Sequence, residues 1–159
     1  MATRNPNPPA LSAVDALTQL SFLVQGALER RASAAALSLS LTRVLGILRD
    51  RRPTMHELAR LMELDKSSVT GLVERAERRG LTERARSPRD GRSVLVTLTA
   101  EGRALVTRVA AEFARDVEDL LRALPSADSV LLTELIERLL VAHAGARGID
   151  LLATEQPSE

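Results

Sequence analysis

The stretch LARLMELDKSSVTGLVERAERRGLTER, residues 58–84, sets the architecture of this 159-residue chain. It contains two runs of apolar residues at helical spacing, separated by a break near Leu64. Asp65 is suited to cap the second run and Gly80 to end it, because a carboxylate accepts from free N-terminal amides and glycine tolerates a left-handed backbone. Two short helices joined by a tight turn predict a helix-turn-helix.

The first helix of this pair begins just upstream of the quoted stretch. Thr54 and Glu57 stand three residues apart, as in a capping box, where the hydroxyl and the carboxylate each accept from a backbone amide. The N-terminus of a helix also attracts anions. We therefore assign Thr54 to the cap and to a phosphate contact.

The second helix, expected over residues 66–79, has an apolar and a polar face at 100° per residue. The apolar stripe is formed by Val69, Leu72, Val73 and Ala76. The N-terminal part of such a helix reads bases in a major groove. Gly71 costs about 1 kcal/mol relative to alanine, which indicates close approach of a backbone or a base. The candidate DNA-binding residues are Lys66, Ser67, Ser68, Thr70, Gly71, Arg75 and Arg78. The alternative is that they only cap and solvate an exposed helix.

Residues 81–86 and 93–98 alternate in polarity with a period of two, and Asp90-Gly91 marks a turn between them. A hairpin directly after a recognition helix predicts the winged form of the fold, and arginines at its tip suit a narrow minor groove. The candidate wing contacts are Arg86, Arg89 and Arg92, with Arg84 as a phosphate contact. Asp90 is expected to fix the wing through a salt bridge, with Arg75 or Arg92 as partner. The alternative is an ordinary polar hairpin tip.

Helices are also expected on both sides of this middle third. They cover about residues 11–31, a second helix that ends near 50 and is capped by Ser38 or Ser40, then 99–124 and 126–144. The first helix and residues 106–144 are more apolar than one small lobe needs, which favours a dimer. The expected fold class is mainly α with a small β-hairpin: a winged helix-turn-helix with long terminal dimerisation helices. The expected domains are a disordered arm (1–10), a dimerisation helix and linker (11–37), a DNA-binding lobe (38–103), C-terminal dimerisation helices (104–147) and a flexible tail (148–159).

The distribution of charge points to a polyanion. Residues 41–103 carry 14 basic and 9 acidic side chains, whereas the rest of the chain is acidic and the net charge is only +1. Two phenylalanines are the only aromatic residues, so base stacking on aromatic platforms is essentially excluded. The first ten residues lack the apolar segment of a signal peptide and no apolar run spans a membrane, so we expect a cytoplasmic, nucleoid-associated protein.

Catalytic and metal chemistry find little support in the sequence. With no cysteine, disulfides and thiolate metal sites are ruled out. His56 and His143 are the only histidines, so a zinc site would need carboxylate partners. His56 is expected to lie exposed in the capping turn. No nucleophile has an evident base nearby. We therefore expect no metal, no cofactor and no enzymatic activity.

The hairpin and the following helix carry a specific spacing. Asp90-x-Arg92, five residues, Leu98-Thr99, two residues and Gly102 resemble the DxRxxxxxLTxxG signature of the MarR family of bacterial regulators. The similarity extends from Leu58 to Gly102, and the flanking helices agree in order and length. Two positions depart from the usual pattern, since Gly71 replaces a larger side chain and Ala76 a common leucine. These departures concern the operator sequence rather than the family.

The resemblance implies a homodimeric repressor that binds a pseudo-palindromic operator in double-stranded DNA and responds to a small ligand. The family's pocket lies between the dimer helices and the DNA-reading lobe and accepts lipophilic compounds or aromatic acids. Phe22 and Arg43 are the candidate pocket residues. The alternative function is a winged-helix dimer that acts as a protein-interaction or nucleoid-architectural module without a specific operator.

Overall fold

A computed structural model describes residues 11–86 and 93–147. Within these ranges the elements are α1 (Ala13–Ala34), α2 (Leu39–Asp50), α3 (Met55–Met62), α4 (Lys66–Arg78), β1 (Thr82–Arg86), β2 (Val94–Leu98), α5 (Ala100–Leu121) and α6 (Ser126–Arg147). Helix-turn-helix, hairpin and flanking helices follow one another as predicted. The mainly α fold with a small antiparallel hairpin is thereby confirmed.

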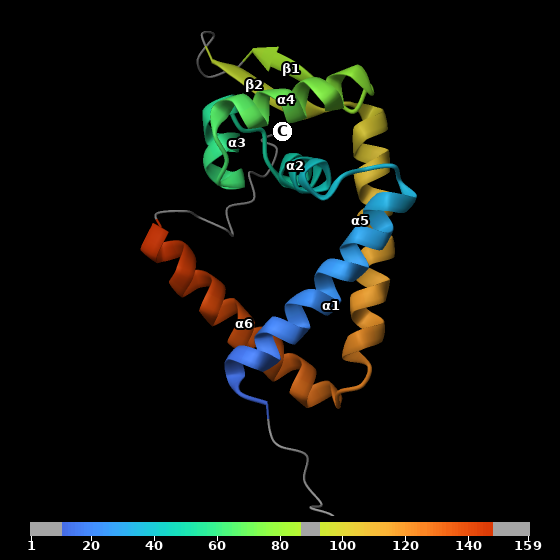
Figure 1. The fold of residues 1–159 in the computed structure, drawn as a ribbon, viewed down its shortest axis with the longest axis vertical. Helices are drawn as coiled ribbons and strands as arrows, with labels where there is room; N and C mark the ends of the chain where they lie inside the picture. The colour runs from blue at the N-terminus through green and yellow to red at the C-terminus, as the bar shows by residue number, and fades with distance from the viewer. Residues whose placement is uncertain (1–10, 87–92, 148–159) are drawn as a thin grey trace, which may run out of the picture.

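The elements form a compact lobe and a set of long helices (Figure 1). The lobe at the top holds α2, α3, α4 and the hairpin, and α5 runs down from it. Helix α1 packs against α5, and α6 crosses the lower end of both in this view. In the described ranges no single helix is long and apolar enough to cross a membrane. Helices α1 and α2 reach the required length and apolar composition only when counted together, and they meet at an angle of 91°.

Side-chain caps fix where the helices begin, because the first amides of a helix lack intrahelical acceptors. The N-cap side chains that accept from an amide three residues later are Ser12, Ser38, Thr54, Asp65 and Thr99. Ser38 therefore caps α2, which decides between the two predicted serines. Three predicted ends of flanking helices differ by about one turn. Helix α1 continues to Ala34 rather than ending near residue 31, α5 ends at Leu121 rather than near 124, and α6 continues to Arg147 rather than ending near 144.

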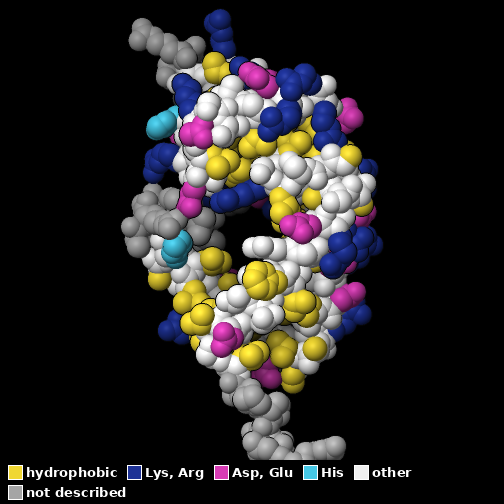
Figure 2. All heavy atoms as spheres, viewed as in Figure 1, with side chains coloured by type: hydrophobic (Ala, Val, Ile, Leu, Met, Phe, Trp, Pro, Cys, Tyr) yellow, Lys and Arg dark blue, Asp and Glu magenta, His cyan; other side chains and the backbone are white. Residues whose placement is uncertain are grey.

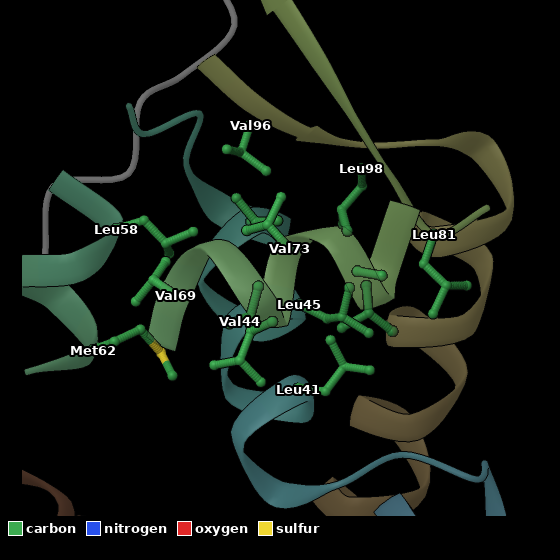
Figure 3. Packing of buried hydrophobic residues seen from close by; sticks show 14 of the residues in the cluster. Leu41, Val44, Leu45, Leu58, Met62, Val69, Val73, Leu81, Val96 and Leu98 are labelled. Atoms are coloured by element: carbon green, nitrogen blue, oxygen red, sulfur yellow. The ribbon is translucent and has the colours of Figure 1, made fainter. Parts of the chain in front are cut away.

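The core of the lobe is aliphatic. In Figure 3 side chains from α2, α3, α4 and β2 converge on one another, with Val73 near the centre of the view. The least exposed large side chains are Val44, Leu45, Leu48, Leu58, Val69, Val73 and Val96. The predicted stripe of α4 is buried in full, with each of its four residues at most 5% exposed. Burial of this stripe leaves the opposite side of α4 facing outward.

The hairpin is attached to the helix-turn-helix through backbone contacts. Its register pairs Thr82 with Leu98 and Arg86 with Val94. The amide of Val96 donates to the carbonyl of Pro53 at 2.9 Å, and a β-bridge joins Thr54 to the neighbouring Leu95. The segment that leads into α3 thus extends the small sheet and holds the wing beside the two helices.

Candidate nucleic-acid interface

Helix α4 presents a continuous polar surface on the side opposite its buried stripe. Thr70 and Gly71 are half-buried there. The exposed members are Lys66, Ser67, Ser68, Glu74, Arg75 and Arg78. All seven recognition-helix residues predicted from the sequence therefore lie on one accessible side of one helix. A helix of this width and polarity fits a major groove.

The N-terminal end of α4 contains a small network around Asp65. The hydroxyls of Ser67 and Ser68 donate to its carboxylate at 2.5 and 2.7 Å, and the amide of Ser68 donates at 2.8 Å. These hydrogen bonds, first from Ser67 and then from Ser68, hold the pKa of Asp65 well below its usual value. The carboxylate is therefore ionised at neutral pH and would repel a phosphate.

Three hydroxyls on this surface have their protons engaged within the protein. Ser67 and Ser68 donate to Asp65, and Thr70 donates to the carbonyl of Lys66 at 2.7 Å. Their oxygen lone pairs remain available. In this arrangement the hydroxyls act outward as acceptors, which matches the amino donors of adenine and cytosine in the major groove.

A shallow hollow opens beside Gly71. Its volume is about 490 Å³, and it is lined by Ser40, Leu64, Ser67, Ser68, Gly71, Leu72 and Arg75. A Cβ added to Gly71 would meet only the Nη1 atom of Arg75, at an ordinary 3.5 Å. The fold itself therefore does not require glycine here. Ser40 and Leu64 were not predicted, because packing of α2 and the turn against α4 brings them to this hollow.

The described part of the hairpin places its arginines unequally. Arg86 is exposed at the last paired position of β1, towards the tip. Arg84 instead forms an ion pair with Glu77 of α4, with 3.1 Å between Nε and Oε1. The predicted phosphate contact of Arg84 thus competes with a contact that fixes the hairpin to α4. Arg89, Asp90 and Arg92 lie outside the described residues.

Comparisons with known proteins agree with this arrangement. A family model described as the MarR family matches residues 37–93, the segment from the start of α2 to the start of β2. This segment of the chain is similar to the MarR family. The transcriptional regulator PecS of Dickeya dadantii (strain 3937) is 28% identical over 130 residues, which cover 79% of this chain and 78% of PecS.

Solved structures of other proteins share the fold. CouR from Rhodococcus jostii RHA1, solved with p-coumaroyl-CoA, is 25% identical with a TM-score of 0.67, covering 83% of this chain and 95% of CouR. Ligand-free wild-type MarR from E. coli is 22% identical with a TM-score of 0.68, covering 82% of this chain and 98% of MarR. The match therefore includes the long helices as well as the lobe.

Thr54 has a structural role at the start of α3. Its amide and its hydroxyl both donate to Oε2 of Glu57, at 2.7 and 2.8 Å, and the amide of Glu57 donates back to the hydroxyl at 3.3 Å. This is the predicted capping box. The bonds from the amide and hydroxyl of Thr54 lower the pKa of Glu57. The carboxylate occupies the donors that a phosphate would use, and the phosphate contact stays a prediction.

The two candidate pocket residues lie on different helices. Phe22 is 61% exposed on α1. Arg43, on α2, donates through Nη2 to the carbonyl of Leu61 at 3.3 Å, near the end of α3. Helix ends carry free carbonyls with partial negative charge, so Arg43 stabilises α3 in this state.

The described residues offer no cluster for a metal. Across residues 11–86 and 93–147, no three His, Asp or Glu side chains lie close enough together to hold an ion. His56 is exposed in the first turn of α3, as predicted, and His143 is exposed on α6.

Proposed function

We propose that this protein is a member of the MarR family and a sequence-specific DNA-binding regulator that acts as a homodimeric repressor. The observation that carries the proposal is the surface of α4, where seven small polar or basic residues lie opposite a fully buried stripe. In this proposal the hydroxyl groups read base edges in the major groove, and Arg75 and Arg78 bind nearby phosphates.

The hairpin supplies the second contact in the proposal. Arg86 leads towards the tip that contains Arg89 and Arg92. Guanidinium groups at that place suit the negative potential of a narrow minor groove. Asp90 would hold the tip through an ion pair.

A second copy of the chain is the expected partner of the long helices. Helix α6 has no buried side chain among its described residues, although it carries many aliphatic ones. Hydrophobic side chains gather over the lower half of the molecule, the region of α1 and α6 (Figures 1 and 2). The exposed large apolar residues of these two helices include Val14, Leu17, Phe22, Leu23, Val130, Leu131, Leu135, Leu139 and Leu140. Apolar surface of this extent marks an interface.

A symmetric pair of lobes implies a pseudo-palindromic operator with half-sites about 10 bp apart, or a multiple of it. Other proteins of this fold have been solved with small ligands, NadR with 4-hydroxyphenylacetate and CouR with p-coumaroyl-CoA. We propose that this chain also binds a small lipophilic compound or aromatic acid. Phe22 and Arg43 are the candidate pocket residues to test. A repressor of this kind acts on the nucleoid in the cytoplasm.

Fluorescence anisotropy with two duplexes tests the function. One duplex carries the upstream region of the protein's own gene, and the other is a scrambled sequence of the same composition. We expect binding to the first to be tighter by about 10³-fold or more at physiological salt. Equal affinities would contradict a sequence-specific regulator and favour an architectural module. Footprinting on the preferred duplex then gives the operator.

A further inference from the structure

A single arginine side chain links the C-terminal end of α4 to the C-terminal end of α1. Arg79 is the C-cap residue of α4. Its side chain reaches the end of α1, where Nη1 donates to the carbonyl of Ala36 at 2.8 Å and Nη2 lies 3.4 Å from that of Ala35. More than forty residues separate these partners in the sequence.

Both helix ends have a geometry that turns carbonyls outward. At the end of α1, Ala36 has a positive φ of 53°, and the amide of Leu37 donates back to Ala32. At the end of α4, Gly80 has a φ of 69°, and the next amide donates back to Ala76. Each end carries partial negative charge. The Arg79 guanidinium gives the carbonyls of Ala35 and Ala36 a donor and offsets the partial negative charge at the end of α1.

The contact joins a helix of the interface to the helix that reads DNA. The far part of α1 carries the exposed apolar residues assigned above to the second copy, and its near end is attached to α5 by Arg31 and Asp116. We propose that Arg79 is a positioning residue for DNA binding, which sets the orientation of α4 relative to α1 and so the spacing of the two lobes. This inference rests on the proposed function.

Two variants and a control test it in the full-length protein. Arg79→Met keeps the aliphatic stem and removes charge and donors, while Arg79→Lys restores the charge with one donor group. Arg78→Met is the matched control, since Arg78 is the adjacent arginine on the exposed side of α4. Affinity is measured by anisotropy on the footprinted duplex at several salt concentrations, and also on that duplex with one base pair inserted at its centre.

Loss of Arg79 should lower affinity about three- to tenfold. The salt dependence should stay as in wild type, because no phosphate contact is lost, and the penalty for the inserted base pair should shrink. Arg79→Lys should recover part of the affinity and part of the insertion penalty. Arg78→Met should instead reduce the slope of log affinity against log salt by about one and leave the insertion penalty unchanged.

Hydrogen exchange tests the contact without DNA. The amides of residues 35–37 should exchange faster in Arg79→Met than in wild type, while the amides of α3 stay unchanged. If residues 35–37 exchange equally fast in Arg79→Met and wild type, the inference is overturned, whatever the DNA-binding result. The inference is also overturned if Arg79→Met reduces the salt slope by one, or if it leaves the penalty for the inserted base pair unchanged. A wild-type protein that binds both duplexes equally refutes the proposed function instead, and faster exchange in that case leaves Arg79 a structural link only.

Discussion

Two glycines show how differently one residue type is used in this lobe. Gly102 lies in the first turn of α5, where an added Cβ would stand 1.9 Å from the carbonyl oxygen of Leu81. The same carbonyl accepts from the amide of Thr99 at 3.1 Å, and the hydroxyl of Thr99 donates to the carbonyl of Gly80 at 2.6 Å. Close contact between α5 and the end of α4 is therefore the physical reason for Leu-Thr-x-x-Gly in this chain.

Replacing Gly102 by alanine should destabilise the fold by about 1–3 kcal/mol, because the methyl group must push α5 away from Leu81. Urea unfolding followed by circular dichroism measures the change. Gly46→Ala is the control: Gly46 is helical with nothing within 4 Å of an added Cβ, so this variant should gain about 0.5–1 kcal/mol. Equal stability of wild type and Gly102→Ala would show that the contact is easily relieved.

Gly71→Ala should have the opposite consequence. The protein offers room for the methyl group, so the free energy of unfolding should rise by about 1 kcal/mol through helix propensity. DNA affinity should fall about tenfold or more if a sugar or base packs against the helix backbone there. Anisotropy on the preferred duplex measures this, with Gly46→Ala again as control. A stabilised variant with unchanged affinity would mean that DNA keeps its distance from Gly71.

Helices α1 and α5 are joined by an ion pair near the C-terminal end of α1. The guanidinium of Arg31 donates to both carboxylate oxygens of Asp116, at 2.8 and 2.5 Å, and lies 3.7 Å from Glu112. The hydrogen bond from Arg31 lowers the pKa of Asp116 from its ordinary value. A carboxylate with a lowered pKa stabilises the fold at neutral pH, and that stabilisation is lost as pH falls through its folded pKa.

Asp116→Asn should therefore lower the melting temperature at pH 7, and the difference from wild type should shrink at pH values below about 3.9, where the unfolded carboxyl is protonated. Differential scanning calorimetry at pH 7, 5 and 3 measures it. Asp119→Asn is the control, because Asp119 pairs with Arg122, the C-cap residue of the same helix, and this ion pair joins no second helix. A difference that stays constant across these pH values would show that charge does not hold α1 to α5.

The long helices α1 and α6 expose a large apolar surface. Leu139 on α6 is 61% exposed, and Val130 on the same helix is 60% exposed. Isolated helices are marginal in water, and most helical stability in proteins comes from packing. In the proposed homodimer, the second copy would stabilise α6 and would also supply the symmetry of DNA reading.

Leu139→Glu should give a monomer with less helix and DNA binding weakened by about a hundredfold or more, since a carboxylate must be desolvated in the interface and one lobe makes half the contacts. Light scattering after size exclusion and circular dichroism measure the first two effects. Glu137→Gln, an exposed polar change on the same helix, should remain a dimer. A dimeric Leu139→Glu protein with full affinity would place the interface elsewhere.

The caps, the helix-turn-helix, the buried stripe of α4 and the hairpin were all predictable, because each depends on residues within a few positions of one another. The caps Thr54 and Asp65 and the stop at Gly80 all stand as expected. Helix ends without such signals, as at Ala34, were placed less well. The polar surface of α4 followed from the stripe, since a helix that buries one side exposes the other.

The contacts made by the arginine side chains could be identified only from the tertiary structure. Arg43 contacts the end of α3, Arg79 the end of α1, and Arg84 pairs with Glu77. Ser40 joins the hollow beside Gly71 for the same reason. A long charged side chain has no periodic signal of its own, and its partner is whichever carbonyl or carboxylate packing brings within reach. Local chemistry therefore set the elements, and long-range packing decided which charges hold the lobe together and which stay exposed on its surface.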